Sequence, residues 1–237
     1  MELWNSYDGY LFDIDGTLLN CEDAVHYYAF CETLSAVAGR SLNLNGVTTH
    51  GNTDIGILRD AFALNDVDES RWRPHLASIS ADLCRRVLQH KDQMRVRVLP
   101  GVTQILEYLH ACGKATGVAS GNLEAIGWTK VECGKLLHYF TTGTFSGRFE
   151  HRCEIFRAAA NQMQSMLSAR ARICVIGDTC HDIEAARLTG LNVVAVATGT
   201  HGIEDLLKRA PDICVSNLED TLALQLPSVS GSMTSAA

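Results

Sequence analysis

The sequence predicts an α/β fold, in which a doubly wound parallel sheet carries a small helical domain inserted after its first strand. Short apolar runs alternate with helical segments through residues 97–226, as expected for right-handed strand–helix–strand crossovers. The first run, residues 10–13, is apolar up to an aspartate and is typical of a buried parallel strand. Residues 21–96 show helical periodicity without a strand pattern, which indicates an insertion between core segments 1–20 and 97–226.

Composition and charge restrict the class of protein. The 237 residues suffice for one large domain, or for one domain with an insertion. A net charge of −7 without a basic cluster argues against nucleic-acid or membrane partners. The nine cysteines form no CxxC pair and lack zinc-ligand spacing, so we expect reduced thiols in a cytoplasmic protein. The first residues do not resemble a signal peptide, no apolar run reaches membrane-spanning length, and the oligomeric state stays open.

The insertion is expected to hold three helices, at residues 24–37, 54–63 and 70–91. Gly39 is placed to end the first, and Thr53 or Asp54 to cap the second. Pro74 is compatible with the third only near its start.

The remaining elements follow as strand and helix in turn. Strands are predicted at residues 115–120, 139–142, 172–177, 192–197 and 212–215, and helices at 102–112, 123–133, 152–166, 182–188 and 201–209. The tail, residues 227–237, is rich in serine and small residues and is expected to be disordered.

Two acidic residues follow the first strand. Asp13 ends it, at the edge where open α/β sheets bind ligands, and Asp15 points to the same side if the chain stays extended. One carboxylate could then act as a nucleophile while the other moves a proton. The alternative is a strand that simply ends in an Asp-Gly turn, with Gly16 permitting the sharp bend.

A second polar group follows residues 115–119. The Ser120 hydroxyl and the backbone N–H groups of Gly121 and Asn122 could bind phosphate oxygens, helped by the next helix N-terminus. An ordinary strand-to-helix turn would have the same sequence.

A third group, Asp178 and Asp182, straddles a strand end and a helix start. Both carboxylates could face a cation, or Asp182 could merely cap its helix. Together with Asp13 and Asp15 they would place four carboxylates in one site. Like charges ~4 Å apart repel by about 4 kcal/mol at an effective dielectric of 20, so the set requires a counter-ion. All-oxygen ligands beside a phosphate suit Mg²⁺.

These motifs, in this order, resemble those of the haloacid dehalogenase (HAD) superfamily, and the resemblance covers about residues 7–224. Residues 13–18, Asp-Ile-Asp-Gly-Thr-Leu, resemble its first motif in the phosphatase form. Ser120 matches the second motif, and residues 175–187, Val-Ile-Gly-Asp-Thr-Cys-His-Asp-Ile-Glu-Ala-Ala-Arg, closely resemble the fourth. The insertion resembles the helical cap of one subgroup, in which residues 50–54 would approach the cleft.

The resemblance implies roles for these residues. Asp13 would be the nucleophile that forms an aspartyl-phosphate, and Asp15 the acid and base. The implied Mg²⁺ ligands are Asp13, the Asp15 backbone carbonyl, Asp178 and, through water, Asp182. The implied substrate-binding residues are Gly16, Thr17, Gly121, Asn122, Thr53 and Asp54.

The third motif departs from the family pattern, because the usual lysine, often followed by proline, is absent. Arg152, at a helix start, is our choice for the cationic role, and Arg148 is the alternative.

The implied activity is a Mg²⁺-dependent phosphatase for a small phosphorylated metabolite, similar to phosphoglycolate- or sugar-phosphate phosphatases. A phosphomutase of the β-phosphoglucomutase type is one alternative. A non-catalytic or receiver-like phospho-binding module is another, although a receiver would carry its aspartate on a later strand and no helical insertion.

Overall fold

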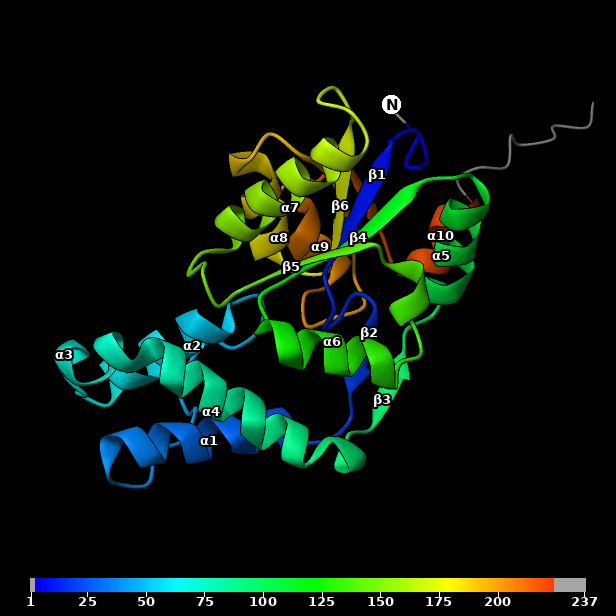
Figure 1. Cartoon of the computed structure of the whole chain (residues 1–237). Coiled ribbons are helices and arrows are strands. Elements are labelled where there is room, and N and C mark those ends of the chain that lie inside the picture. Colours follow the sequence, from blue (N-terminus) through cyan, green and yellow to red (C-terminus); the bar gives the residue numbers. More distant parts are fainter. Residues whose placement is uncertain (1–2, 224–237) are drawn as a thin grey trace, which may run out of the picture.

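The protein contains a central six-stranded parallel sheet (Figure 1). The computed structural model describes residues 3–223. The strands of the sheet are β1 (Gly9–Phe12), β4 (Ala115–Ser120), β5 (Thr142–Phe145), β6 (Ile173–Gly177), β7 (Asn192–Val196) and β8 (Ile213–Val215). The order is β5-β4-β1-β6-β7-β8, and every neighbouring pair is parallel. The chain builds outward from β1 to one side and then to the other, which confirms the predicted doubly wound sheet. The expected tail, residues 227–237, lies outside the described residues.

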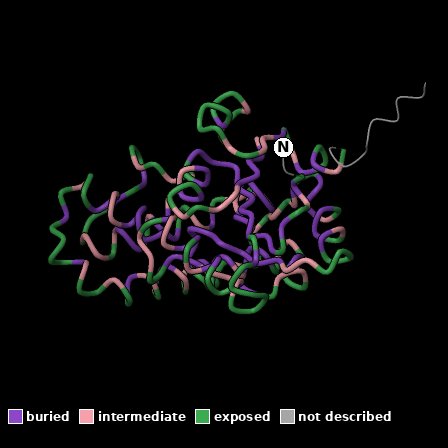
Figure 2. Tube along the Cα trace, turned by 90° about the horizontal axis from the view of Figure 1, so that it is seen from above, coloured by how far each residue is buried: buried purple, intermediate pink, exposed green. Residues whose placement is uncertain are grey.

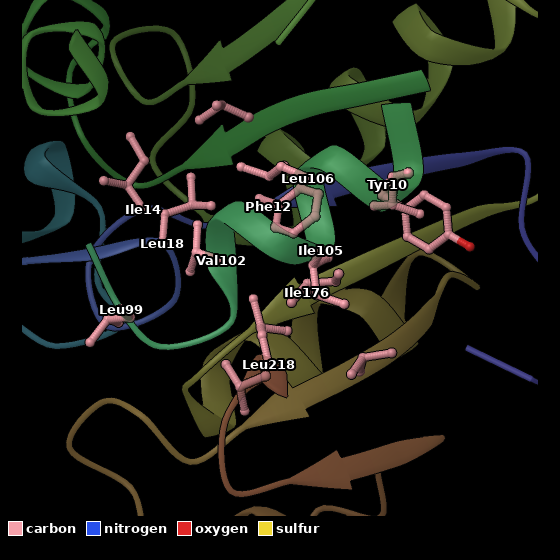
Figure 3. Close-up of a cluster of buried hydrophobic side chains, with 14 of the residues drawn as sticks. Tyr10, Phe12, Ile14, Leu18, Leu99, Val102, Ile105, Leu106, Ile176 and Leu218 are labelled. Carbon is pink, nitrogen blue, oxygen red and sulfur yellow. The ribbon is translucent and has the colours of Figure 1, made fainter. Parts of the chain in front are cut away.

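Helices cover both faces of this sheet. One face packs against α5 (Val102–Ala111) and α10 (Leu218–Ala223), with Phe12, Ile105 and Ile176 in the apolar cluster that Figure 3 shows. The other packs against α7 (Arg152–Met166), α8 (Cys180–Leu188) and α9 (Ile203–Leu207). In Figure 2 the buried residues gather along the middle of the molecule, and exposed residues lie around its outside. The β1 strand is buried at every position, as its apolar sequence predicts.

The inserted helices have an apolar core of their own. They are α1 (Val25–Ala38), α2 (Asp54–Leu64), α3 (Glu69–Trp72) and α4 (Leu76–Gln89), and they lie beyond the carboxyl edge of the sheet (Figure 1). Leu34, Leu58 and Leu83 are fully buried among them. Helix α6 (Glu124–Cys133) belongs to the sheet domain by sequence, yet its Ile126 joins this second core. The division of the chain at residues 20/21 and 96/97 stays a prediction.

The chain enters and leaves the insertion through a short antiparallel pair that the sequence did not predict. Strand β2 (Leu19–Cys21) pairs with β3 (Val96–Val98), Leu19 opposite Val98. Three residues are too few to show the period-two pattern by which strands are identified.

Two predicted elements are wrong in detail. The strand expected at 139–142 is a 3₁₀ turn at Leu137–Tyr139, and β5 starts only at Thr142. The strand is hard to recognise from the sequence because it contains Gly143, and glycine is rare in strands. Glycine is needed at this position because a Cβ there would collide with the Trp128 ring. The helix expected at 70–91 is divided by a 3₁₀ turn, Arg73–His75, that contains Pro74.

No helix within residues 3–223 is long and apolar enough to cross a membrane. The nine cysteines are free thiols.

Candidate active site

Three adjacent strands bring the predicted residues to one edge of the sheet. Asp13 follows β1, Ser120 ends β4 on one side of it, and Asp178 follows β6 on the other. Oxygens of Asp13, Asp178 and Asp182 lie within 4.8 Å of one another, and all three residues are buried. Residues separated by 165 positions in the chain therefore meet in one acidic cluster, at the point where the sheet changes its direction of winding.

The turn after Asp13 fits closely around Asp178. Gly16 has a φ of 83°, which favours glycine, and a Cβ there would collide with the Asp178 carboxylate. Thr17 is buried, and its Oγ1 donates to Asp178 Oδ1 at 2.9 Å. Gly16 and Thr17, predicted to bind substrate, thus lie against the second carboxylate of the cluster and do not line the cavity.

Asp182 combines the two alternatives that the sequence left open. Thr179 is the N-cap of α8, and its backbone N–H donates to Asp182 Oδ2 at 2.9 Å in a capping box. Oδ1 of the same carboxylate lies 2.6 Å from Nε of Arg152. One oxygen caps the helix, and the other faces the acidic cluster.

Arg152 lies between two of these carboxylates. Its Nη2 is 2.7 Å from Asp13 Oδ2, its Nε contacts Asp182, and its Nη1 donates to the backbone oxygen of Gly51 at 3.1 Å. The Nε and Nη2 contacts are close ion pairs, so the Arg152 charge is shared between the Asp182 and Asp13 carboxylates. Arg152 is buried, whereas Arg148 is exposed. The structure places Arg152, not Arg148, beside Asp13.

Lys130 completes the site, and sequence reasoning missed it. This buried α6 lysine donates to Asp15 Oδ1 and Oδ2 at 2.9 and 2.7 Å and to Asn122 Oδ1 at 2.8 Å. Asn122 Nδ2 donates to Asp15 Oδ2 at 2.7 Å and to Ser120 Oγ at 3.0 Å. One feature of the sequence could have indicated that Lys130 is buried: it follows Ile126 by one helical turn and so lies on the apolar side of α6.

Burial sets the proton affinities of the carboxylates. Loss of solvation raises the pKa of Asp13 to about 6; the Arg152 charge opposes this rise and Asp182 adds to it. Burial, with the charges of Asp182 and Asp13, raises the pKa of Asp178 well above its ordinary value. Burial also acts to raise the pKa of Asp15, but the Lys130 charge and the Lys130 and Asn122 hydrogen bonds outweigh it, so this pKa is lowered.

The residues fit a divalent cation. Four carboxylates face two basic side chains, Arg152 and Lys130, which leaves two negative charges in excess when all are ionised. The pKa values of Asp13 and Asp178 are raised first by burial, and the neighbouring carboxylates raise them further. Because Lys130 engages the Asp15 side chain, the geometry is compatible with the expectation that Asp15 offers its backbone carbonyl. Oxygen donors alone suit Mg²⁺.

The insertion contacts the sheet domain beside this cluster. Asp54 donates its backbone N–H to Gly121 O at 2.7 Å, and its Oδ2 accepts from Leu123 N at 2.7 Å. Thr53 Oγ1 caps α2 by accepting from Gly56 N, and donates to Glu150 O at 2.8 Å. Asp54 lines the cavity, whereas Thr53 does not and instead links the insertion to the sheet domain through its bond to Glu150.

A cavity of about 250 Å³ lies between the acidic cluster and the inserted helices. Asp13, Asp15, Ser120, Gly121, Asn122, Arg152 and Asp178 line it on the side of the sheet. Residues 49–52 and side chains of α1 and α2 line it on the other side. A ligand in it would touch both parts of the chain.

This parallel sheet, with carboxylates at the carboxyl ends of its central strands and inserted helices over the adjoining cavity, has the α/β architecture in which ligands bind where the winding of the sheet reverses. The model of the family described as haloacid dehalogenase-like hydrolase matches residues 10–196. The chain belongs to this family, which confirms the resemblance, the fold class and the expectation of a hydrolase.

Individual relatives are distant. A curated protein of Dickeya dadantii, "Probable phosphatase IndB", is 23% identical over 216 residues, 90% of each chain. A solved structure described as a predicted phosphoglycolate phosphatase of Haemophilus somnus superposes with a TM-score of 0.65 at 19% identity, over 93% of this chain and 98% of that one. CbbY of Rhodobacter sphaeroides, solved with phosphate, gives 0.65 at 17% identity, over 90% and 95%. At this identity the structural likeness concerns the fold alone.

Proposed function

We propose that the protein is a Mg²⁺-dependent phosphatase that hydrolyses a small phosphorylated metabolite through an aspartyl-phosphate on Asp13. The observation that carries the proposal is the convergence of Asp13, Asp178, Asp182 and Arg152 at one end of the cavity. The names of the relatives, a phosphatase and a phosphate-bound structure, support the same class of reaction.

Asp13 is the nucleophile. Its carboxylate stands at the end of the central strand beside Arg152 and lines the cavity. It attacks phosphorus in line, the bond from phosphorus to the ester oxygen breaks, and the phosphoryl group is left on a carboxylate oxygen. The Arg152 charge beside Asp13 can attract the phosphoryl oxygens and offset the negative charge that develops on them as the group transfers.

The opposite side of the phosphoryl group meets the end of β4. The Ser120 hydroxyl and the Gly121 N–H are the donors there, both in residues that line the cavity, and the Asn122 N–H, which donates to Ser120 Oγ at 3.4 Å, would have to turn to a phosphate oxygen to join them. Donors fixed by a strand end need little rearrangement when negative charge develops on the oxygens. Asn122 also holds Asp15, so phosphate binding and proton transfer share a residue.

Asp15 is the general acid and general base of the proposed reaction. Its side chain lines the cavity, so a leaving oxygen can reach it. Protonated Asp15 gives its proton to the leaving alcohol, and the resulting carboxylate takes a proton from the water that hydrolyses the aspartyl-phosphate. Lys130 stabilises the ionised form, which is the form needed in the second step.

The implied Mg²⁺ would be held by Asp13, Asp178 and the Asp15 carbonyl, with Asp182 acting through water. When bound, it supplies the positive charge that keeps these carboxylates ionised and offsets the charge of the phosphoryl oxygens. The small metabolite is the partner that we expect.

The test is hydrolysis of p-nitrophenyl phosphate and a panel of phosphorylated metabolites, with Mg²⁺ and with EDTA. We expect turnover to be lost in EDTA and in Asp13→Asn, and retained in Asp92→Asn, a change at an exposed aspartate. Full activity of Asp13→Asn, or in EDTA, would overturn the proposal.

A further inference from the structure

The basic side chains of the cavity are already matched by acidic ones. Of the cavity-lining side chains in the described part of the chain, two are lysine or arginine: Lys130 and Arg152. The Lys130 ammonium has three N–H donors, and its three contacts are the two oxygens of Asp15 and Oδ1 of Asn122. Arg152 is paired with Asp13 and Asp182 and is required by the phosphoryl group. No lysine or arginine is left over for a second anionic group of a substrate.

The cavity wall away from the acidic cluster is apolar. Tyr27 and Phe30 of α1, Leu44, and Ile57 of α2 form it, and we call these four side chains the apolar wall. Phe30, Leu44 and Ile57 are buried, while Tyr27 stands at the rim with 41% of its surface exposed. A carboxylate or phosphate against this wall would lose water without gaining a partner.

Polar groups next to the apolar wall are acidic or uncharged. The buried Asp54 carboxylate lines the cavity and would repel a second anion. His26 Nε2 is buried, lies 3.5 Å from Asp54 Oδ2 and has no hydrogen-bond partner among the described residues, so it can pair with a substrate hydroxyl. A positive charge on His26 would be matched by Asp54 already. His50, which also lines the cavity, is exposed to solvent.

We infer that the enzyme takes monophosphate esters of uncharged, hydroxylated alcohols and discriminates against substrates that carry a carboxylate or a second phosphate. This inference rests on the proposed phosphatase function. It excludes phosphoglycolate as the preferred substrate. It also disfavours the phosphomutase alternative, because a mutase returning the phosphoryl group to a sugar phosphate must hold two phosphates.

The test uses two substrates that differ at one group. Glycerol 3-phosphate and 3-phosphoglycerate share a carbon skeleton, and a hydroxymethyl group in the first replaces the carboxylate of the second. We expect kcat/KM to be at least tenfold higher for glycerol 3-phosphate. If turnover of both is slow, each is measured as a competitive inhibitor of p-nitrophenyl phosphate hydrolysis, and the inhibition constants should differ by the same factor in the same direction.

A gain-of-charge variant locates the discrimination. Tyr27→Lys places a cation on the rim of the apolar wall, and the exposure of this position allows the substitution. We expect it to improve kcat/KM for 3-phosphoglycerate relative to glycerol 3-phosphate at least fivefold. Tyr28→Lys is the matched control: it adds the same charge to the same helix at a residue that does not line this cavity, and should leave the ratio unchanged.

The outcomes separate this inference from the phosphatase proposal. Hydrolysis of p-nitrophenyl phosphate with equal or better use of 3-phosphoglycerate by the wild-type protein would overturn the inference and leave the phosphatase standing. Equal effects of Tyr27→Lys and Tyr28→Lys would also overturn it, because general electrostatics would then explain the preference. Failure to hydrolyse any phosphate ester would overturn the phosphatase itself.

Discussion

Replacing Arg152 with methionine removes the cation that contacts both Asp13 and Asp182. Methionine keeps much of the side-chain volume, so the change is mainly one of charge. The guanidinium lies 2.7 Å from Asp13 Oδ2 and 2.6 Å from Asp182 Oδ1, and both carboxylates are buried. Breaking a buried ion pair by removing one partner typically costs about 3–5 kcal/mol of folding free energy, because a buried charge is left uncompensated.

That cost should depend on pH and on metal. In EDTA at pH 8 we expect Arg152→Met to lower the free energy of unfolding by about 3 kcal/mol. At pH 5 the penalty should shrink, because Asp13, whose pKa is already raised to about 6, takes up a proton and needs no cation. Urea unfolding at the two pH values measures both quantities.

The catalytic cost is separate. Loss of a preorganised donor to the transferring group typically lowers kcat by about 10²–10³-fold. We therefore expect Arg152→Met to lose that factor with Mg²⁺ present, and Arg152→Lys to recover part of it because the charge returns without the fork geometry. Arg148→Met is the matched control and should be within about twofold of wild type, since its side chain is exposed. Equal loss in the two methionine variants would refute the role given to Arg152.

Three further predictions follow from the same contacts. Lys130→Met should raise the pKa of Asp15 and move the falling limb of the kcat/KM pH profile to higher pH for a substrate whose leaving oxygen needs a proton, whereas Lys91→Met, at a surface lysine, should not; an unmoved limb would contradict the pairing. Burial raises the pKa of Asp13 from its ordinary value of 3.8 to about 6, so the stability it contributes to the metal-free protein is present at low pH and lost as pH rises through 6. The unfolding free energy of Asp13→Asn relative to wild type in EDTA should therefore be higher at pH 8 than at pH 5 by about 1 kcal/mol, because roughly half of a shift of about two pKa units, at 1.36 kcal/mol each, is titrated between these pH values; a difference independent of pH would be inconsistent with that shift. Glu150→Gln breaks half-exposed ion pairs to two arginines of the insertion, and should raise KM severalfold while changing stability by less than about 1 kcal/mol; an unchanged KM would show that these pairs do not help to position the insertion.

Strand ends made most of the site predictable. Asp13, Ser120 and Asp178 each follow an apolar run, and a parallel sheet necessarily brings the carboxyl ends of adjacent strands together. Gly16 was expected from its turn, although its tight fit against Asp178 depends on a strand far along the chain.

What the sequence did not reveal depends on contacts between distant segments. Lys130 lies 115 positions from Asp15, and nothing in its own helix indicates which carboxylate it meets. The role of Asp182 is divided between capping α8 and facing Arg152, and a local pattern can show only the first. Strand β5 was misplaced because Gly143 is dictated by the neighbouring Trp128 ring, not by strand propensity.

The most direct test of the account is to trap the covalent intermediate. Asp15→Asn should still be phosphorylated by p-nitrophenyl phosphate, whose leaving group needs no proton, but should be unable to activate water for the second step. After an acid quench, mass spectrometry should find one added phosphoryl group on the peptide containing Asp13, dependent on Mg²⁺ and absent from the Asp13→Asn, Asp15→Asn double variant. Active protein in which phosphate is found on another residue, or in which the double variant is still labelled, would contradict the account.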